Sequence, residues 1–317
     1  MLIFRGLDTS GLRSSKQAPH DSAVALTIGN FDGVHLGHQA LLKQLSQAAQ
    51  ARRLPVAVLT FEPHPREFFT PEKAPARLTS LREKLAFFSE MGIDRVHVCR
   101  FNARFAEMTA QQFASALFTK LNAKFILVGD DFRFGSQRAG DFALMSQMAA
   151  QHGATVQAMP SLLHSDVRVS STAVRAALAA GDLRAAKNYL GRSYSISGRV
   201  VHGDGVGKKL GFPTANVQLK HNFPPLIGIF VVQVEGDDVP SMQGVASLGV
   251  RPTISANGKP VLEVHLFNFS GEIYNQYLRI NFLHKLRDEE KYSSLEILTQ
   301  QIARDVQDAK RWFLAHP

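Results

Sequence analysis

The fold of this chain is decided by AVALTIGNFDGVHLGHQALL, residues 23–42, in which a short apolar run passes through a glycine-rich turn into an amphipathic pattern. The run at 23–28 consists of small and branched apolar residues and predicts a buried β-strand. From residue 37 onward, apolar residues recur at three- and four-residue spacing, which predicts a helix. A strand, a tight turn and a helix in that order are typical of an α/β sheet that binds its ligand at the carboxyl end of the strand.

The same alternation continues to residue 160. Apolar runs predict further strands at 55–62, 94–101, 124–132 and 154–160. Helical spacing recurs between these runs at 80–91, 110–121 and 142–153. We therefore expect a doubly wound, mostly parallel Rossmann-like α/β sheet.

The pattern changes after two helical segments at 171–181 and 182–191. Glycine and proline turns then separate alternating runs that predict an antiparallel sheet or small β-barrel, at 194–203, 228–236, 242–250, 261–269 and 276–286. An amphipathic helix is expected from about Ser293 to Phe313. A length of 317 residues favours two domains, which we place at 1–185 and 186–317.

Composition restricts the class of protein. The chain is 45% hydrophobic with a mean hydropathy of −0.08, yet no apolar run approaches the roughly 18 residues of a membrane span. The opening segment lacks the apolar centre of a signal peptide, and the single cysteine, Cys99, cannot form an internal disulfide. We therefore expect a cytoplasmic protein with no membrane partner.

The charge balance favours an anionic ligand. The net charge is +9, divided as +7 over residues 1–190 and +2 over residues 191–317. The basic residues occur singly or in pairs, without the Lys/Arg runs or interleaved aromatic residues that are typical of nucleic-acid binding. We expect nucleotides as ligands and no nucleic-acid partner.

The turn after the first strand carries the first candidate site. Gly29 and Gly33 permit a tight turn, and His35 and His38 then lie at the start of a helix, where free amides favour anions. Beside the small Gly37, two imidazoles can donate hydrogen bonds to a triphosphate and to departing pyrophosphate. This arrangement predicts nucleotidyl transfer without a covalent intermediate. The alternative is that the two histidines are incidental to a helix start.

Three later stretches could complete such a site: TFEPHP at 60–65, VGDDFRFGSQRAGD at 128–141 and VSSTAVR at 169–175. Asp130 follows a strand end, where a carboxylate can contact ribose, flavin or metal, or can be an ordinary loop acid. Hydroxyls and a basic residue at a helix start can hold phosphate as well as cap the helix, and this set is Ser170, Ser171, Thr172 and Arg175. His64 and Arg138 are further candidates.

The second candidate site is GDGVGKKLGFPTANV, residues 203–217. Its glycines and lysines form a flexible loop that could surround phosphates, with Gly203, Gly205, Gly207 and Lys209 as the candidate residues. The spacing is not that of a Walker A loop, and the glycine content alone is equally typical of a surface loop. Further on, the alternation of VLEVHLFNF places Glu263 on the face opposite to Leu262 and Val264.

These motifs together resemble one family. GNFDGVHLGH is similar to the HxGH signature of nucleotidylyltransferases, and with the later stretches it resembles the bacterial bifunctional riboflavin kinase/FAD synthetases over about residues 20–312. PTAN at 213–216 resembles the flavokinase signature. VLEVHLFNF with SGEIY resembles that family's catalytic-glutamate strand, although Val264 replaces a usual threonine and Asn268 a common aspartate.

The resemblance implies a role for each motif. The adenylylation site would use His35 and His38, with Gly29, Asn30 and Gly37 at ATP. The kinase site would use Glu263 as the base for the riboflavin 5′-hydroxyl. Thr214 and Asn216 would hold Mg²⁺ there. Flavin contacts would come from His64, Asp130, Arg138 and Arg287.

The activity implied is phosphorylation of riboflavin to FMN by the C-terminal domain and adenylylation of FMN to FAD by the N-terminal domain, with ATP, riboflavin and FMN as small-molecule partners. Two alternatives belong to other classes. A nucleotidyltransferase acting on another phosphorylated acceptor would leave PTAN and Glu263 unexplained. A non-catalytic flavin- or nucleic-acid-binding module would leave both phosphate motifs unexplained. The sequence leaves open whether the chain forms a homo-oligomer.

Overall fold

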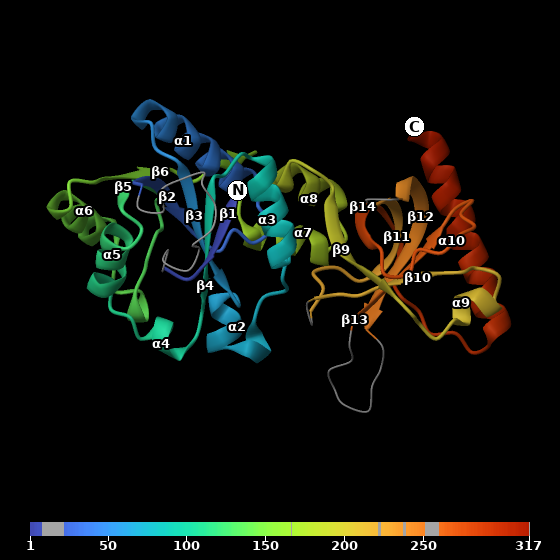
Figure 1. Ribbon diagram of the computed structural model, residues 1–317. Helices are drawn as coiled ribbons and strands as arrows, with labels where there is room; N and C mark the ends of the chain where they lie inside the picture. Colours follow the sequence, from blue (N-terminus) through green and yellow to red (C-terminus); the bar gives the residue numbers. More distant parts are fainter. Residues whose placement is uncertain (8–21, 166, 221–222, 237–238, 251–259, 317) are drawn as a thin grey trace. The chain divides into compact units, whose positions relative to one another are not determined.

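The computed structural model describes residues 1–7, 22–165, 167–220, 223–236, 239–250 and 260–316. The chain divides into two compact units. The first unit contains Met1–Pro75 and Leu81–Val169, and the second contains Ala76–Ser80 and Ser170–Pro317 (Figure 1).

The first unit is built on a parallel six-stranded sheet with the order β1-β4-β3-β2-β5-β6. The five predicted strands are confirmed as β2 (Val24–Ile28), β3 (Val56–Glu62), β4 (Arg95–Arg100), β5 (Ala123–Gly129) and β6 (Thr155–Met159). The sequence pattern did not predict β1 (Leu2–Arg5), which pairs in parallel with β4 at the edge of the sheet. The expected doubly wound parallel sheet is confirmed.

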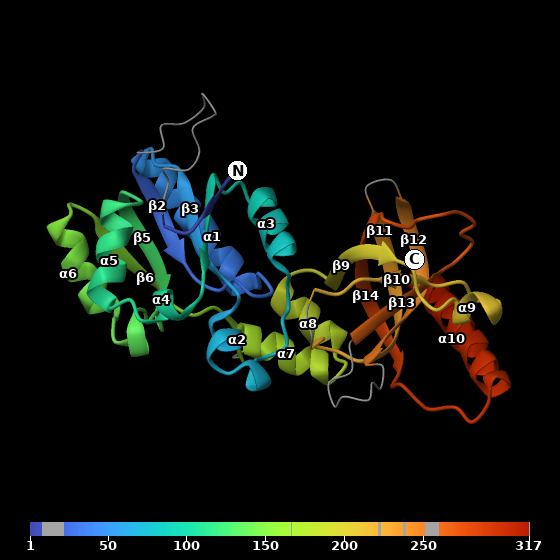
Figure 2. The ribbon, with the colours of Figure 1, turned by 60° about the horizontal axis from the view of Figure 1, so that its bottom comes forward.

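Helices cover both faces of this sheet. On one face, α1 (Leu36–Arg52) and α3 (Leu81–Glu90) pack through residues such as Leu42 and Phe88. On the other face, α5 (Ala110–Thr119) and α6 (Phe142–Gln151) pack through residues such as Phe113 and Met145 (Figure 2). The predicted helices are confirmed. Their starts are set locally, because Thr109 forms a capping box with Gln112 and Asp141 caps α6.

Short elements connect the strands and helices. They are α2 (Pro65–Phe69), the 3₁₀ turns η1 (Pro71–Lys73) and η2 (Ser136–Arg138), α4 (Ala103–Ala106), and a hairpin of β7 (Leu163–His164) and β8 (Val167–Arg168). Most of them follow the carboxyl ends of strands. They therefore lie where the predicted ligand residues are.

The second unit contains a closed barrel with the order β10-β13-β12-β11-β14-β9. Its strands are β9 (Tyr194–Val201), β10 (Ala215–Val217), β11 (Gly228–Gly236), β12 (Val239–Val250), β13 (Pro260–Leu266) and β14 (Tyr277–Arg287), all paired antiparallel. The five predicted strands are confirmed. The sixth, β10, is only three residues long and overlaps the end of the PTAN stretch, where the sequence pattern predicted a loop.

Three helices pack on the barrel. The pair α7 (Ser171–Ala179) and α8 (Leu183–Leu190) shares one apolar core with the barrel interior, and this core also includes Leu78. The C-terminal helix α10 (Leu295–Ala315) packs on the other side through Val306 and Ala309. The predicted amphipathic helix is thus confirmed, with Ser294 as its N-cap.

The predicted domain boundary after residue 185 stays a prediction. In the structure this position falls within α8, whose buried residues Leu183, Ala186 and Leu190 pack on the core of the second unit.

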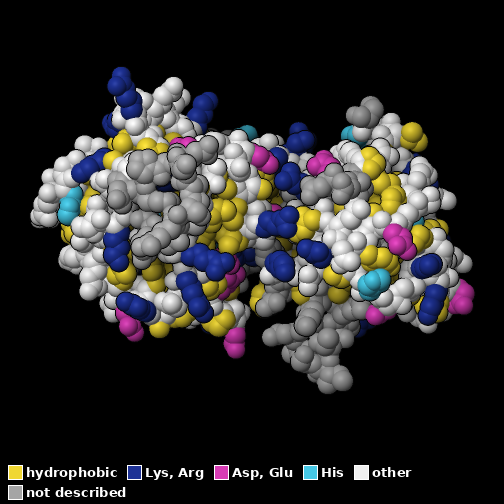
Figure 3. Space-filling view, in the orientation of Figure 1, with side chains coloured by type: hydrophobic (Ala, Val, Ile, Leu, Met, Phe, Trp, Pro, Cys, Tyr) yellow, Lys and Arg dark blue, Asp and Glu magenta, His cyan; other side chains and the backbone are white. Residues whose placement is uncertain are grey.

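Basic side chains are spread over the face of the molecule that Figure 3 shows.

Candidate active sites

The first candidate site lies at the carboxyl end of β2, between β3 and β5. Parallel α/β sheets bind ligands at this edge, where the strand order reverses. The chain leaves β2 through a turn in which Phe31, Gly33 and Val34 all have positive φ angles. Gly33 adopts this conformation without steric cost, and the side chains of Phe31 and Val34 are buried. The turn places His35 at the N-cap of α1.

His35 and His38 form a stacked pair, with ring centroids 3.6 Å apart and an interplanar angle of 19°. Nδ1 of His35 accepts a hydrogen bond from the backbone N–H of His38 at 3.3 Å. Gly37 permits this close packing, because a Cβ there would lie 3.1 Å from the His35 ring. Burial, then the nearby His35 and Lys84, holds the pKa of His38 well below its usual range. A neutral imidazole at a helix start can donate a hydrogen bond to phosphate.

Three buried polar atoms at this strand end have no hydrogen-bond partner among the described residues. They are Thr27 Oγ1, Asn30 Oδ1 and His38 Nδ1. Leaving a buried polar group unpaired costs about 1–3 kcal/mol. Such a group of atoms therefore fits a site that is completed by a polar ligand. The predicted residues Gly29 and Asn30 lie in this turn, where a Cβ on Gly29 would lie 3.1 Å from the Phe31 ring.

A lysine that no sequence motif marks belongs to the same region. Lys84 of α3 is only 1% exposed, and its Nζ donates to the backbone carbonyl of Asn30 at 3.2 Å. Its Nζ also lies 3.8 Å from Oε2 of Glu62. In the sequence, Lys84 is one of several charged residues in an amphipathic helix. Only its burial distinguishes it.

The predicted phosphate-binding residues at the start of α7 belong to the second unit. Ser170 is the N-cap of α7, and its Oγ accepts from the backbone N–H of Ala173 at 3.2 Å. Nε of Arg175 donates to the carbonyl of Ala76 at 2.6 Å. Ser171 and Thr172 form the first turn of the helix. A phosphate-binding role for these residues stays a prediction.

The predicted flavin contacts in the first unit have structural partners. His64 caps α2 in a capping box with Glu67. Asp130 accepts from the N–H of Ser161 at 3.0 Å and from its Oγ at 2.9 Å, and these bonds lower the pKa of Asp130. Arg138 is exposed in η2. Their contact with flavin stays a prediction.

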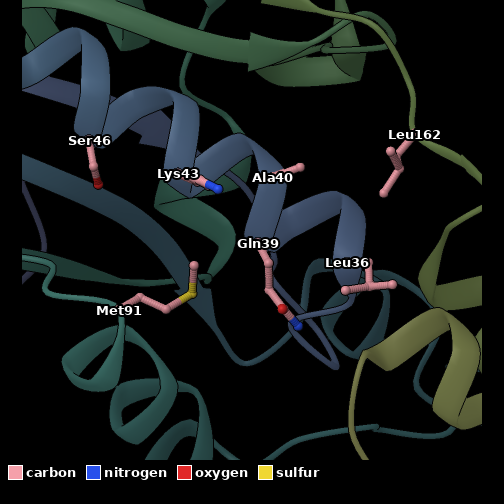
Figure 4. A pocket seen from close by; sticks show the side chains of 7 residues that line it. All are labelled: Leu36, Gln39, Ala40, Lys43, Ser46, Met91 and Leu162. Atoms are coloured by element: carbon pink, nitrogen blue, oxygen red, sulfur yellow. The ribbon is translucent and has the colours of Figure 1, made fainter.

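A pocket of about 490 Å³ runs along α1 beside this site (Figure 4). It is lined by Leu36, Gln39, Ala40, Lys43, Ser46, Met91 and Leu162. Leu36 adjoins the histidine pair in the sequence, but none of the lining residues was predicted to take part in a site. The five lining residues that belong to α1 are spaced along one face of the helix, and the sequence does not distinguish this face from an ordinary solvent-facing surface.

The second candidate site lies between β9 and β13 of the barrel. The glycine-rich stretch includes one helical turn, α9 (Val206–Lys209), where a loop was expected. A Cβ on Gly203 would overlap the carboxamide of Asn216. A Cβ on Gly207 would lie 3.1 Å from Oγ1 of Thr214. The two glycines therefore let the backbone approach the two side chains that are predicted to hold the metal.

The other two predicted phosphate residues of this stretch lie on α9. Gly205 is its N-cap, with a positive φ of 69°, a conformation that glycine adopts at no steric cost. Lys209 ends the helix and is exposed. Their role in binding phosphate stays a prediction.

Strand pairing brings Glu263 next to Asn216. In the register of β13, Glu263 is directly opposite Asn216 of β10 on one side and Ser247 of β12 on the other. Directly opposite residues share one face of a sheet. Their neighbours Leu262 and Val264 are fully buried in the core, so the predicted alternation is confirmed. Glu263, Asn216 and Ser247 thus form a polar row on the outer face of the barrel.

His265, two residues further along the same strand, has a backbone partner. Its Nδ1 lies 2.9 Å from the carbonyl oxygen of Pro213. A carbonyl oxygen only accepts hydrogen bonds, so Nδ1 donates the proton in this contact. His265 therefore ties β13 to the chain just before Thr214.

The residues of this site fit a magnesium ion. Mg²⁺ takes oxygen ligands, and in phosphoryl-transfer enzymes Ser, Thr or Asn side chains help to hold it together with substrate phosphates. Thr214 and Asn216 offer a hydroxyl and a carboxamide oxygen, close against the glycines of the loop. Among the described residues there is no group of three or more His, Cys, Asp or Glu side chains that could hold a metal instead.

The end of β14 and the residues that follow it include one predicted residue, Arg287, and one that was not predicted, Glu289. Arg287 binds Asp305 of α10 through two hydrogen bonds, of 2.8 Å from Nε and 2.6 Å from Nη2. Glu289, which was not predicted, hydrogen-bonds to Ser247, and burial raises its pKa. A Cβ on Gly249 would overlap the Glu289 carboxylate. A flavin contact of Arg287 stays a prediction, since the structure shows it joining the barrel to the C-terminal helix.

Two family models match successive parts of the chain. Residues 17–173 match the FAD synthetase family model, and residues 190–313 match the riboflavin kinase model. A bifunctional riboflavin kinase/FMN adenylyltransferase of Escherichia coli K12 is 47% identical over 96% of both chains. The chain belongs to the bifunctional riboflavin kinase/FMN adenylyltransferase family.

Other members of this family are similarly close. The Haemophilus influenzae enzyme is 46% identical over 91% of this chain and 94% of its own. The enzyme of Pseudomonas fluorescens is 45% identical over 98% and 97%.

One solved structure carries a different name. It is a crystal structure of a Streptococcus pneumoniae protein called a macrolide-efflux protein, which covers 96% of this chain and 97% of its own with a TM-score of 0.78 and 27% identity. In the part of the present chain that the structure describes, no helix is long and apolar enough to cross a membrane.

Proposed function

We propose that this chain phosphorylates riboflavin to FMN and adenylylates FMN to FAD, each with ATP. The observation that supports the proposal is that one member of this family has two separate groups of polar residues suited to bind phosphates. One is the histidine turn at the end of β2, and the other is the polar row of Asn216, Glu263 and Ser247 beside the glycine-rich stretch.

In adenylylation, a phosphate oxygen of FMN attacks the α-phosphorus of ATP. A new P–O bond forms, the bond from the α-phosphorus to the α,β-bridging oxygen breaks, and pyrophosphate leaves. His35 and His38 donate hydrogen bonds to the phosphates as negative charge moves onto the leaving group. No base is required, because the attacking phosphate is already ionised. Asn30 and the glycines of the turn bind the nucleotide. Ser170, Ser171, Thr172 and Arg175, at the start of α7, are the other proposed phosphate-binding residues.

In the kinase reaction, the 5′-hydroxyl of riboflavin attacks the γ-phosphorus of ATP, and ADP leaves. Glu263 takes the hydroxyl proton as the new P–O bond forms. The geometry supports this role, because Glu263 is directly opposite Asn216, whose carboxamide lies close against Gly203. Gly203, Gly205, Gly207 and Lys209 surround the phosphates.

Thr214 and Asn216 would hold Mg²⁺ in the kinase site. A bound Mg²⁺ would neutralise phosphate charge there. We place adenylylation in residues 1–185 and the kinase in residues 186–317, and His64, Asp130, Arg138 and Arg287 at the flavins. The ATP dependence of both steps suits an enzyme of the cytoplasm.

Product analysis tests the proposal. Purified protein with riboflavin, ATP and Mg²⁺ should form FMN, FAD, ADP and pyrophosphate, and protein given FMN should form FAD and pyrophosphate. A nucleotidyltransferase for another acceptor would make no FMN from riboflavin. Flavin binding without any product would overturn both activities.

A further inference from the structure

Lys84 is the least exposed charged side chain near the adenylylation site, with 1% of its surface accessible. Burying an ammonium group is costly unless hydrogen bonds and an opposite charge compensate. The hydrogen bond to the Asn30 carbonyl and the nearby Glu62 carboxylate compensate for burying the Lys84 ammonium. Its position relative to the histidine pair gives it a use beyond packing.

The partners of Lys84 come from the ends of two neighbouring strands. Asn30 follows β2, and its carbonyl accepts from both Lys84 Nζ and Thr60 Oγ1, each at 3.2 Å. Glu62 is the last residue of β3, and its carboxylate lies 3.8 Å from Lys84 Nζ. β2 and β3 pair in parallel. Lys84 thus joins the two strand ends at the edge where a doubly wound sheet binds its ligand.

Lys84 also acts on the histidine pair through charge. Its ammonium is one of the groups that hold the pKa of His38 low, after burial and His35. The charged and titratable groups around this point include His35, His38, Lys84 and Glu62, and the buried Asp32 belongs to the same turn. Glu62 is one-third exposed, so solvent screens its charge more than that of Lys84.

We propose that Lys84 is a positioning residue of the adenylylation reaction, fixing the Asn30 turn and supplying a buried positive charge beneath the nucleotide phosphates. The proposal rests on the proposed function. The turn begins with Asn30 and ends with His35, so an ammonium bonded to the Asn30 carbonyl limits movement of the histidine pair. A positive charge of low solvent exposure also attracts a triphosphate more strongly than an exposed lysine does.

The test compares Lys84→Met, which keeps length and removes charge, with Lys84→Arg, which keeps charge. Lys120→Met removes one exposed lysine from the same unit and is the control. Riboflavin phosphorylation by the same full-length chains is measured in parallel as a check on the second unit. The adenylylation kcat and the KM for ATP are measured with supplied FMN.

We expect Lys84→Met to lower adenylylation kcat/KM by about 100-fold, the size of effect that a misplacement near 1 Å produces. The riboflavin kinase rate should be unchanged, Lys84→Arg should recover most of the loss, and Lys120→Met should match the parent. NMR titration of His38 should show its pKa raised in Lys84→Met but not in Glu62→Gln, because only the first change removes positive charge.

Several results would overturn the inference. Parental adenylylation by folded Lys84→Met would remove any role in the reaction. An equal loss in Lys84→Arg, with no change in the pKa of His38, would show that Lys84 only packs. If Lys84→Met does not fold, Lys84→Arg alone decides. Adenylylation about 100-fold below the parent by a folded Lys84→Arg would count against the role of charge, and adenylylation near that of the parent would support it. Absence of FAD formation by the parent would instead overturn the proposed function.

Discussion

Glu263 is the residue on which the kinase proposal depends most. It lies opposite Asn216 on the outer face of the barrel, and Glu263→Gln keeps its shape while removing its basicity. We predict that riboflavin kinase turnover falls about 100-fold or more, with the KM for ATP and riboflavin little changed. Adenylylation of supplied FMN should persist. Steady-state kinetics of both reactions on one preparation measure this.

His265→Ala is the matched variant for Glu263, because it lies two residues away on the same face of β13. Its Nδ1 is bonded to the Pro213 carbonyl, so we expect a smaller loss that comes from positioning Thr214. Kinase turnover near that of the parent in Glu263→Gln, with a large loss in His265→Ala, would transfer the role of base to His265. Parallel loss of both activities would indicate misfolding.

His38 should be essential for adenylylation alone. Replacing it with alanine removes one hydrogen-bond donor at the developing pyrophosphate charge and should cost about 10²- to 10³-fold in rate. Riboflavin phosphorylation should survive, because His38 belongs to the first unit. Pyrophosphate release with supplied FMN is the measurement. Normal FAD synthesis by the variant would contradict the role assigned to the histidine pair.

His97 should make the first unit sensitive to acid. It is 1% exposed, its ring stacks on Phe4 at 4.7 Å, and burial lowers its pKa to about 4. Above the unfolded-state pKa of about 6.5, His97 is neutral in both the folded and the unfolded chain, and stability does not depend on it. As the pH falls from there toward 4, the unfolded chain takes up the proton more readily than the folded chain, so the folded state loses stability. The free energy of unfolding should therefore decrease by up to about 3 kcal/mol over that interval.

Calorimetric melting of the full-length chain from pH 7 to pH 4 measures this effect. His97→Phe keeps an aromatic ring against Phe4 but cannot titrate. The melting temperature of the first unit should then depend less on pH than in the parent. Identical pH dependence in both proteins would exclude His97 as the cause.

At the scale of elements, α7 and α8 belong energetically with the barrel. Buried residues of both helices, including Val174, Leu178 and Leu183, share the barrel's apolar core. Each fully buried Val or Leu side chain contributes about 1.5–3 kcal/mol. A fragment of residues 170–317 should therefore be more stable than one of residues 186–317, which lacks α7 and cuts α8.

Chemical denaturation followed through Trp312, the only tryptophan, compares the two fragments. The longer one should fold, convert riboflavin to FMN and make no FAD. Equal stability of the two fragments would show that α7 and α8 contribute little to the barrel. A longer fragment that folds but lacks kinase activity would place part of the kinase site in residues 1–169.

At the scale of the whole molecule, the two activities should be separable between chains. His38 and Glu263 belong to different units, so His38→Ala and Glu263→Gln should each remove one reaction. A mixture of the two variants should form FAD from riboflavin, because FMN released by one chain can be adenylylated by the other. Either variant alone should make little FAD. No FAD from an active mixture would mean that FMN does not leave the chain that makes it.

The amino-acid sequence by itself determined the class of each half and the position of most elements. Strand and helix periods, and N-caps such as Ser170 and Ser294, depend on residues close together in the chain. The turn after β2 and the alternation around Glu263 are local in the same sense. Such features are set by backbone sterics and near-neighbour hydrogen bonds, so they can be read from the sequence.

The tertiary structure alone decided which side chains share an environment. The edge strand β1 forms because β4, some ninety residues later, supplies its partner. Arg287 ends β14, and it pairs with Asp305 only because α10 packs beside the barrel. Lys84 is one charged residue among several until α3 packs beneath the turn at Asn30. Burial of a charge depends on long-range packing that fixes its distance to partners and water, and no local pattern records that distance.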